Sequence, residues 1–394
     1  MKIINDPIHG FIQVRFPRVL RAIEHPVVQR LRRLSQLGLA QMVYPNATHT
    51  RFAHALGAMH LMDVALRTLS EKRTIRLPEK THEAALLAAL LHDIGHGPFS
   101  HSLEGLILPF PHETITYALL DLLEADLGEL SETRAILQGH HPLPYLCELI
   151  QGPLDVDRLD YLVRDSFFTG VQEGIVGTER LIYTLTVTPD GHLAVEEKGL
   201  ASVEKFILAR RFMYWQVYLH KTVIAAENLL KRWLTHWRVS HGPLLGESYT
   251  LSPQVLLDFA RLDDMRVWAL IHEGTQASHL PLRIFSLALL RRVLFKIQWG
   301  TPSQGDYQAW EAQLPPPLQA EAKTFWIEDR AYSATYEPSP AHEIRIFTKQ
   351  KKVLLLSEVA PWLMAAGPIE KPYWGFLSAA SLESLLQSLE TPQG

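Results

Sequence analysis

Side chains that bind metal ions or transfer protons are concentrated in one short segment of the sequence, residues 90–104. Its histidines and carboxylates are His92, Asp93, His96, His101 and Glu104. Imidazoles and carboxylates ligate transition metals, and both act as general acids and bases. Glu104 follows His101 by three residues, a spacing that places the pair on one helix face, where the carboxylate could fix the imidazole tautomer. A structural turn needs none of this chemistry, so the segment predicts an active site.

The chain around this segment is suited to presenting it. Thr81–Leu91 is rich in strong helix formers and ends directly before His92 and Asp93, so we expect a helix to deliver both side chains at its carboxyl end. The glycines that follow let the backbone turn closely, and Pro98 is expected to open a further helix at its first position.

Two more segments could complete a metal site. Arg51–Gly57 begins another apolar helix and carries His54. Residues 155–165 are dense in acidic side chains at helical spacing. Spacings of three and four residues place five side chains of this segment on one helix face: Asp157, Asp160, Tyr161, Arg164 and Asp165. Taken alone, this acidic run also fits a solvated charged surface, so spacing leaves both interpretations open.

Most of the remaining sequence predicts helices, because apolar residues recur at spacings of three and four. These segments are residues 112–125, 134–150, 200–238, 252–273 and 282–298. Three hairpins are predicted, from Lys2–Ile4 with Phe11–Val14, Tyr183–Val187 with Leu193–Glu196, and Glu343–Phe347 with Val353–Leu356. Residues 299–318, rich in glycine and proline, indicate a linker. We expect a mainly α protein with a helical core at 1–240, a helical extension at 241–310 and a small C-terminal α/β region at 311–394.

The composition gives no reason to expect a nucleic-acid or membrane partner. Lys and Arg number 38 against 42 Asp and Glu, a net charge of −4, so an anionic ligand must be held by a local group of cations. The longest purely apolar run, residues 84–91, is far shorter than the roughly 20 residues of a membrane-spanning helix. No apolar leader segment follows the first residues, and the single cysteine, Cys147, cannot form an internal disulfide. These features favour a cytoplasmic protein.

Specific sequence blocks occur in order through the first 235 residues. They read Ile4-Asn-Asp-Pro-Ile-His-Gly10, Gln29-Arg-Leu-Arg32, Gln36-Leu-Gly38, Thr50-Arg-Phe-Ala-His54-Ala-Leu-Gly57, His92-Asp-Ile-Gly-His-Gly-Pro-Phe-Ser-His101, Asp155-Val-Asp-Arg-Leu-Asp-Tyr161 and Tyr218-Leu-His-Lys221. Together they resemble the HD phosphohydrolase superfamily, and more closely its dNTP triphosphohydrolase branch. The resemblance implies a helical HD-domain core with short β-hairpins. Beyond residue 240 the likeness is faint, and Leu262-Asp-Asp264 is its best fragment.

The resemblance implies hydrolysis of a deoxynucleoside triphosphate to deoxynucleoside and inorganic triphosphate, by metal-activated water that attacks the α-phosphorus. The implied metal ligands are His54, His92, Asp93 and Asp157. Two imidazoles and two carboxylates suit one iron, manganese or zinc ion, and Mg²⁺ or Mn²⁺ would arrive with the substrate triphosphate.

The resemblance also assigns acid–base and phosphate-stabilising roles. His101, held by Glu104, is the implied acid that protonates the 5′-oxygen of the leaving group. His96 and His112 are implied to bind the α-phosphate region and to stabilise its developing charge. This branch more often has Asp where the chain has Glu104, a change that keeps the carboxylate and lengthens its reach.

The implied substrate contacts form three groups. The phosphate-binding cations are Arg51, Arg210 and Lys221. The residues that hydrogen-bond the 3′-hydroxyl are Gln36 and Asp165. The residues that pack against the sugar are Tyr161 and Tyr218, and a tyrosine under C2′ would leave no room for a 2′-hydroxyl. The neighbouring aromatics Tyr214 and Trp215 are interpreted as ordinary helix core.

An effector site and an oligomer are further implications. Asn5, Glu24 and Arg32 fall where this branch binds an activating nucleotide, although Glu24 replaces an Asp and Phe11 stands where a His would be. The family usually assembles as dimers or tetramers, so a homo-oligomer is expected on resemblance alone.

Two other functions are kept open by the sequence. One is an HD phosphohydrolase that acts on another nucleotide or on a phosphodiester. The other is a non-catalytic nucleotide sensor, which would bind a nucleotide without turnover. A nuclease for single strands is disfavoured by the balanced charge and by the absence of a stripe of alternating basic and aromatic residues.

Overall fold

The computed structural model describes residues 1–246, 250–333, 336, 343–363 and 368–390. Helices form most of this structure and the strands lie in small sheets, so the expected mainly α fold is confirmed. Among the described helices, none is long and apolar enough to span a membrane.

The first part of the chain is organised around long buried helices. The hairpin of β1 (Lys2–Asp6) and β2 (Gly10–Val14) pairs antiparallel, as expected from its sequence. Helix α3 (Arg51–Glu71) packs against α4 (Glu79–Leu91) and against α8 (Val156–Thr169). Buried residues lie on all sides of α4, because neighbouring elements surround it.

Shorter elements complete this part of the chain. The α-helices are α1 (Pro17–Glu24), α2 (Pro26–Gln29), α5 (His112–Leu127), α6 (Ser131–Leu137), α7 (Pro144–Gln151) and α9 (Thr178–Thr184). The 3-10 turns are η1 (Arg30–Arg33), η2 (Ala40–Met42), η3 (Ser100–Leu103), η4 (Gln172–Gly174) and η5 (Glu197–Gly199). The helix expected over 134–150 is divided into α6 and α7, because Gly139, at φ +74°, follows the end of α6 and Pro144 opens α7.

The helix expected over 200–238 is also interrupted. Helix α10 (Leu200–Met213) passes into one π-helical turn, η6 (Tyr214–Tyr218), before α11 (Lys221–His241) begins. Such turns widen the helix locally and often occur at functional sites.

The rest of the chain mixes helices and strands. Its helices are α12 (Pro253–Phe259), α13 (Asp264–Gly274), α14 (Leu280–Leu290), α15 (Gln304–Glu311), α16 (Pro316–Gln319), α17 (Leu356–Val359) and α18 (Ala379–Glu390), with 3-10 turns η7 (Ala322–Phe325) and η8 (Pro361–Leu363). Its strands are β5 (Lys296–Trp299), β6 (Trp326–Ser333), β7 (Arg345–Phe347), β8 (Val353–Leu355) and β9 (Ile369–Phe376). Residues 299–318, expected as a linker, therefore contain α15 and α16.

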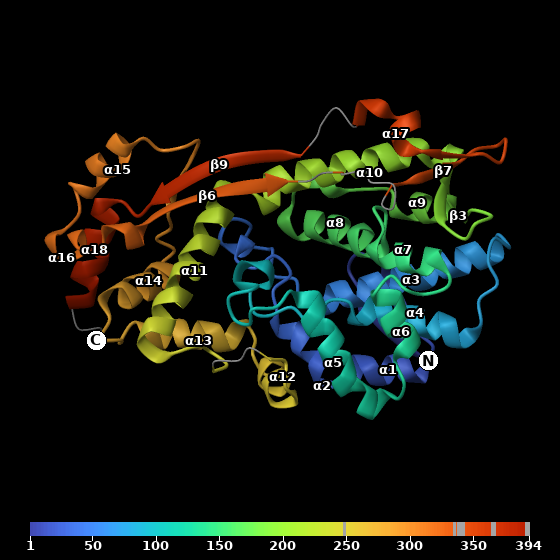
Figure 1. Ribbon diagram of the computed structural model, residues 1–394, viewed down its shortest axis with the longest axis horizontal. Helices are drawn as coiled ribbons and strands as arrows, with labels where there is room; N and C mark the ends of the chain where they lie inside the picture. Colours follow the sequence, from blue (N-terminus) through green and yellow to red (C-terminus); the bar gives the residue numbers. More distant parts are fainter. Residues whose placement is uncertain (247–249, 334–335, 337–342, 364–367, 391–394) are drawn as a thin grey trace.

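Two sheets connect segments that lie far apart in sequence. Strands β3 (Leu185–Val187) and β4 (Leu193–Glu196) form the hairpin expected there, and β4 pairs in parallel with β7. In the other sheet β9 lies between β5 and β6. The C-terminal segment thus runs along one side of the molecule (Figure 1), from η8, where Trp362 donates to Glu204 of α10, to α18 beside α14. The three sequence regions share these sheets, and the boundaries at 240 and 310 remain a division based on sequence.

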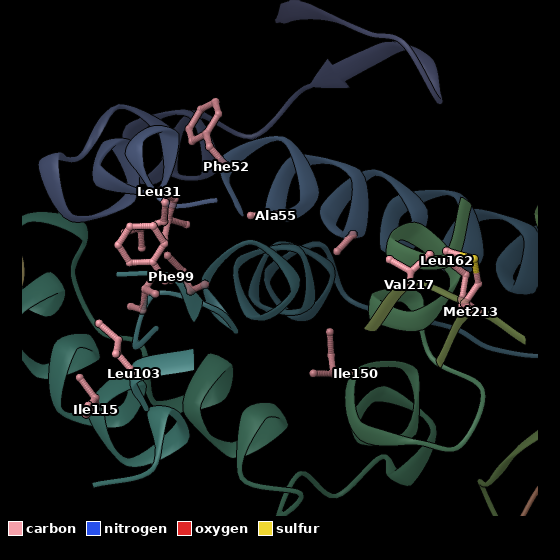
Figure 2. Close-up of a cluster of buried hydrophobic side chains, with 14 of the residues drawn as sticks. Leu31, Phe52, Ala55, Phe99, Leu103, Ile115, Ile150, Leu162, Met213 and Val217 are labelled. Carbon is pink, nitrogen blue, oxygen red and sulfur yellow. The ribbon is translucent and has the colours of Figure 1, made fainter. Parts of the chain in front are cut away.

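One continuous set of buried apolar residues runs through the described chain. Figure 2 shows part of it, with Leu31, Phe52 and Phe99 grouped near one end of the view and Leu162 and Met213 at the other. Phe99, inside the histidine-rich segment, is completely buried, so this segment is anchored in the core by its own apolar residue.

The closest approach between α3 and α8 depends on Gly57. A Cβ atom at this position would overlap the Asp160 carboxylate and would also meet the Arg164 guanidinium. Asp160 and Arg164 are fully buried and hydrogen-bonded to each other, so neither side chain can swing away into solvent.

We predict that Gly57→Ala destabilises the protein by roughly 1–3 kcal/mol, because the added methyl group must displace this buried ion pair. Urea denaturation measures the change. Gly305→Ala is the matched control, since it adds the same methyl group to an exposed helix where the nearest atom is 3.6 Å away. Equal stability of the two variants would contradict the predicted crowding.

Candidate active site

The histidine-rich segment lines a cavity of about 680 Å³, which is within the size range of small-molecule sites. Its walls come from η3, α5, α8, η6 and α11, together with the loop that contains Gln36. Of the residues singled out from the sequence, the cavity is lined by Gln36, Arg51, His92, Asp93, His96, His101, His112, Asp157, Tyr161, Asp165, Arg210 and Tyr218.

The four candidate metal ligands lie close together: His92, Asp93 and Asp157 line the cavity, and the ligand atoms of His54, His92 and Asp93 all lie within 4.8 Å of one another. His54 Nε2 is 3.3 Å from His92 Nε2 and 3.0 Å from Asp157 Oδ1. His92 Nε2 is 3.6 Å from Asp157 Oδ1 and 3.3 Å from Asp93 Oδ1. Ligand atoms about 2.1 Å from a metal ion lie roughly 3.0 to 3.4 Å apart at octahedral or tetrahedral angles, so these separations suit a shared cation.

The second nitrogen of each imidazole is already occupied. His54 Nδ1 donates to Asp160 Oδ2 at 2.7 Å, and His92 Nδ1 donates to the Ala89 carbonyl at 2.8 Å. These hydrogen bonds leave both Nε2 lone pairs facing each other and Asp157. Such outer contacts orient the histidines of metal sites and raise their basicity as ligands.

The electrostatics of these groups favour a bound positive charge. Burial alone would lower the pKa of His54, but hydrogen bonds from its ring to Asp157 and Asp160 raise it to about 10. Burial would raise the pKa of Asp157, but His54 and His92 hold it well below its usual range. The donor set therefore fits a metal ion, which would take the place of the proton on His54 Nε2 and balance the charge of Asp157.

Asp160 connects this cluster to the N-terminal hairpin. Its carboxylate accepts hydrogen bonds from His9 Nε2 at 2.6 Å and from Arg164 Nε and Nη2, each at 2.8 Å, in addition to His54. Arg164 Nη1 also donates to Asp6 at 2.9 Å. The orientation of His54 thus depends on a buried ion network that reaches β1.

A second histidine cluster lies beside the first. Glu104 accepts hydrogen bonds from His101 Nδ1 at 2.7 Å and from His112 Nδ1 at 2.6 Å. The ring of His96 stacks on His112, with centroids 3.8 Å apart, and its Nε2 lies 3.4 Å from Asp93 Oδ1. The spacing of His101 and Glu104 therefore brings them into contact, although through a 3-10 turn and not an α-helix.

Two imidazoles of this second cluster, those of His101 and His96, differ in how far they are exposed to solvent. His101 is 69% exposed, so it can meet a ligand that enters from solvent. His96 is 2% exposed, and burial and Arg51 hold its pKa well below the usual value, which keeps its ring neutral. Its Nδ1 has no partner among the described residues.

The backbone that carries His101 is in an unusual conformation. Pro98 does not open a helix at this point, because Phe99 and Ser100 both have φ +55°, in the left-handed region. Such residues cost of order 1 kcal/mol each and persist where other contacts hold them. Here Asp264 accepts a hydrogen bond from the Phe99 amide at 2.8 Å, and the Ser100 hydroxyl donates to the Ser35 carbonyl at 2.6 Å.

The candidate sugar-binding residues lie on another wall of the cavity. Tyr218 donates its hydroxyl to Asp165 Oδ2 at 2.7 Å, and its ring stands perpendicular to Tyr161 at 6.2 Å. The side-chain oxygen of Gln36 is buried without a hydrogen-bond partner among the described residues. An unpartnered buried oxygen is costly, so it is suited to a ligand hydroxyl.

The candidate phosphate-binding cations are placed differently from one another. Arg210 lines the cavity, and its buried Nε has no partner among the described residues. Arg51 also lines it but donates to Asp93 and, at 2.8 Å, to the Ser100 hydroxyl. Lys221 is exposed and is not among the residues that line the cavity; its Nζ lies 5.8 Å from the Trp299 ring.

Several residues of the cavity were not singled out from the sequence. Arg158 lines it with a buried Nε that has no partner among the described residues, and its place inside the acidic run 155–165 was the available signal. Tyr214, interpreted from sequence as helix core, also lines the cavity, because the π-helical turn rotates it there. His49 donates to Asp165 Oδ1 at 2.7 Å from behind the wall. His49 belongs to no motif or regular spacing in the sequence, so the sequence alone did not mark it as a site residue.

The candidate effector residues lie near the N-terminal hairpin. Glu24 pairs with Lys2 at 3.1 Å, and Arg32 lies over the ring of Phe52 at 3.8 Å. Asn5 is on β1, opposite Phe11. No hydrogen bond or ion pair in the described part of the chain joins these three residues to one another, so a shared site there remains a prediction.

Comparison with known proteins gives matches across both parts of the cavity. Residues 51–165 match the HD domain, and residues 176–299 match the HD associated region. Uncharacterized protein YwfO from Bacillus subtilis is 31% identical over 279 residues, which cover 67% of this chain and 64% of YwfO. Deoxynucleoside triphosphate triphosphohydrolase SAMHD1 from Danio rerio is 27% identical over 278 residues, which cover 58% of this chain and 44% of SAMHD1. The matches thus span about two thirds of the first relative and less than half of the second.

A solved structure agrees over nearly the whole chain. The crystal structure of a phosphohydrolase from Bacteroides thetaiotaomicron superposes with a TM-score of 0.87 at 35% identity and covers 95% of this chain and 99% of that one. The sequence matches, the shared fold and the paired histidine–carboxylate clusters lead to one conclusion. The chain belongs to the HD-domain family of metal-dependent phosphohydrolases.

Proposed function

We propose that this protein hydrolyses deoxynucleoside triphosphates to deoxynucleoside and inorganic triphosphate. The observation that carries the proposal is the set of groups that share one cavity: metal-ligand candidates, a histidine cluster joined to them through Asp93, two arginines whose Nε has no partner among the described residues, and a group of tyrosines. Such a set of groups suits the parts of a nucleoside triphosphate. The name of the SAMHD1 relatives supports the same substrate class.

His54, His92, Asp93 and Asp157 would hold the metal ion. When bound there, a transition metal supplies Lewis acidity that polarises a phosphoryl oxygen and makes water a nucleophile at neutral pH. The donor set suits iron, manganese or zinc, and Mg²⁺ or Mn²⁺ would accompany the triphosphate.

The protein's own residues would then divide the remaining work. Arg158 and Arg210 offer unpartnered donors to the triphosphate, and neutral His96 can donate or accept at the α-phosphate without adding charge. As water attacks the α-phosphorus, the bond from that phosphorus to the 5′-oxygen breaks. His101, held by Glu104, would give the departing oxygen its proton.

The sugar would sit against the tyrosine wall. Gln36 and Asp165 would bind the 3′-hydroxyl, while Tyr161 and Tyr218 would close the space beside C2′. His49 and Tyr218 hold both oxygens of Asp165, so its carboxylate is positioned before a ligand arrives. An effector nucleotide at Asn5, Glu24 and Arg32, a homo-oligomer of two or four chains and a cytoplasmic location are part of the same proposal.

The test is to incubate metal-analysed protein with each dNTP and rNTP plus Mn²⁺ or Mg²⁺ and to separate the products by chromatography. Deoxynucleoside and intact triphosphate are expected from dNTPs. Monophosphate or diphosphate products would place the attack on another phosphorus and favour a different phosphohydrolase activity. Binding without any product, in metal-loaded protein, would indicate a nucleotide sensor.

We predict that Asp157→Ala loses the bound metal and all turnover while it keeps its fold. The Asp157 carboxylate lies 3.0 Å from His54 Nε2 and 3.6 Å from His92 Nε2, so its removal takes away one of the two carboxylates that can share a metal ion with both imidazoles. Metal content per chain and circular dichroism measure the two effects. Glu179→Ala, which removes an exposed carboxylate from α9, should change neither. A metal-loaded, active Asp157→Ala protein would refute this ligand assignment.

We also predict that His101→Ala binds metal and dNTP normally but lowers kcat by about 10²- to 10⁴-fold, the usual contribution of a general acid. His101 contacts Glu104 and none of the metal-ligand candidates, so the loss should be confined to proton transfer. Steady-state kinetics and equilibrium binding separate the two. His140→Ala, an exposed histidine outside the cavity, is the control. An unchanged kcat would move the acid role to His96 or His112.

A further inference from the structure

The cavity has one end that the proposed chemistry does not use. It is formed where η2, η3 and the first half of α11 meet. Its lining consists of small or apolar residues, Leu37, Gly38, Ala40 and Val223, with two polar side chains, Ser102 and Glu227. Val223 and Glu227 are one helical turn apart on α11, so both face the same space.

This end is narrow because Gly38 lies close to its polar residues. Gly38 has φ +51°, and a Cβ there would lie 3.0 Å from Ser102 Oγ and 3.7 Å from Glu227 Oε1. A side chain at position 38 would therefore close the gap between the Gln36 loop and Glu227. Glycine therefore keeps a narrow slot open at this point of the lining.

Glu227 is the acidic group of this slot. Ser102 donates its hydroxyl to Oε1 at 3.0 Å. The second oxygen, Oε2, has no hydrogen-bond partner among the described residues. Burial raises the pKa of the Glu227 carboxyl, with Lys231 and Ser102 acting in the opposite direction. Glu227 is half-buried in the cavity wall, so this second oxygen is open to a hydrogen-bond donor from a ligand in the cavity.

The position of the slot relates it to the nucleotide. Ser102 directly follows His101, the candidate acid at the 5′-oxygen, and Gly38 lies two residues after Gln36, the candidate contact of the 3′-hydroxyl. A nucleotide with its phosphates at the metal cluster and its sugar at Gln36 would extend its base toward this slot. This placement rests on the proposed function.

We propose that Glu227 reads the base of the substrate, with its free oxygen accepting a hydrogen bond from an exocyclic amino group. Guanine, adenine and cytosine each carry such a group, and carboxylates pair with it in nucleic-acid recognition. Thymine presents carbonyl oxygens on either side of its single ring N–H, and these repel a carboxylate. The protein therefore prefers dGTP, dATP and dCTP over dTTP.

The test compares kcat/KM for the four dNTPs between the natural protein and Glu227→Gln. Leaving a buried polar group unpaired lowers kcat/KM by about tenfold or more, so dTTP should fall at least that far below the best amino-bearing substrate. Glutamine keeps the shape of the side chain and adds an N–H₂ donor for a thymine carbonyl. In this variant, the ratio of kcat/KM for the best amino-bearing substrate to kcat/KM for dTTP should therefore fall several-fold, chiefly because kcat/KM for dTTP rises.

Controls separate base reading from other roles of Glu227. Glu179→Gln, the same change at an exposed site, should leave all four values unchanged. Glu227→Ala should abolish the preference against dTTP. Melting temperatures show whether each variant is folded. If folded Glu227→Gln keeps the base ratios of the natural protein, or if that protein does not discriminate against dTTP, the base-reading role is wrong while the proposed function stands. If no dNTP yields deoxynucleoside and triphosphate, the proposed function fails and the base-reading role fails with it.

Discussion

The Asp160 carboxylate is the interaction on which the rest of the structure depends. It is fully buried and takes hydrogen bonds from His54, His9 and the Arg164 guanidinium. A buried charge is stable only when its partners are complete, so α3, α8 and the hairpin loop must all be in place together. Gly57 leaves room for the carboxylate, and the resulting geometry turns the Nε2 of His54 toward the other metal-ligand candidates. Metal binding is thereby coupled to the assembly of the whole N-terminal part.

The residues after position 240 support the site, although their likeness to the family is faint. Asp264 accepts hydrogen bonds from the amides of Ser35 and Phe99 and so fixes both loops that border His101. Fully buried Arg30 adds a second connection, since its guanidinium donates to the His96 carbonyl and to the Leu262 carbonyl. These contacts hold two successive left-handed residues that would otherwise relax. The helical extension is therefore part of the active-site scaffold.

The sequence predicted the elements that are determined by residues close to one another in the chain. The three hairpins, the helix before His92 and the contact of His101 with Glu104 all follow from spacing or turn residues within a few positions. The sequence did not predict the features that depend on contacts between segments far apart in the chain. Strand β9 pairs with β5 across more than 70 residues and with β6 across 36 to 50, and the π-helical turn at Tyr214 lies within an apolar pattern that predicts one helix. Glu227 gave no signal, because one carboxylate on a long helix resembles a solvated residue until the fold places it in the cavity wall.

The distribution of charge in the cavity gives the ligand a direction. The chain carries a net charge of −4, yet the cavity lining offers buried Nε donors of Arg158 and Arg210 that have no partner among the described residues, together with the carboxylate of Glu227. A uniformly positive pocket would attract any polyphosphate, in either orientation. Under the proposed function, Glu227 would repel a phosphate that enters in the opposite orientation and would accept a group that carries hydrogen-bond donors. The same arrangement would bind the triphosphate at the metal-ligand cluster and the base against Glu227, so that orientation and base preference would have a common electrostatic origin.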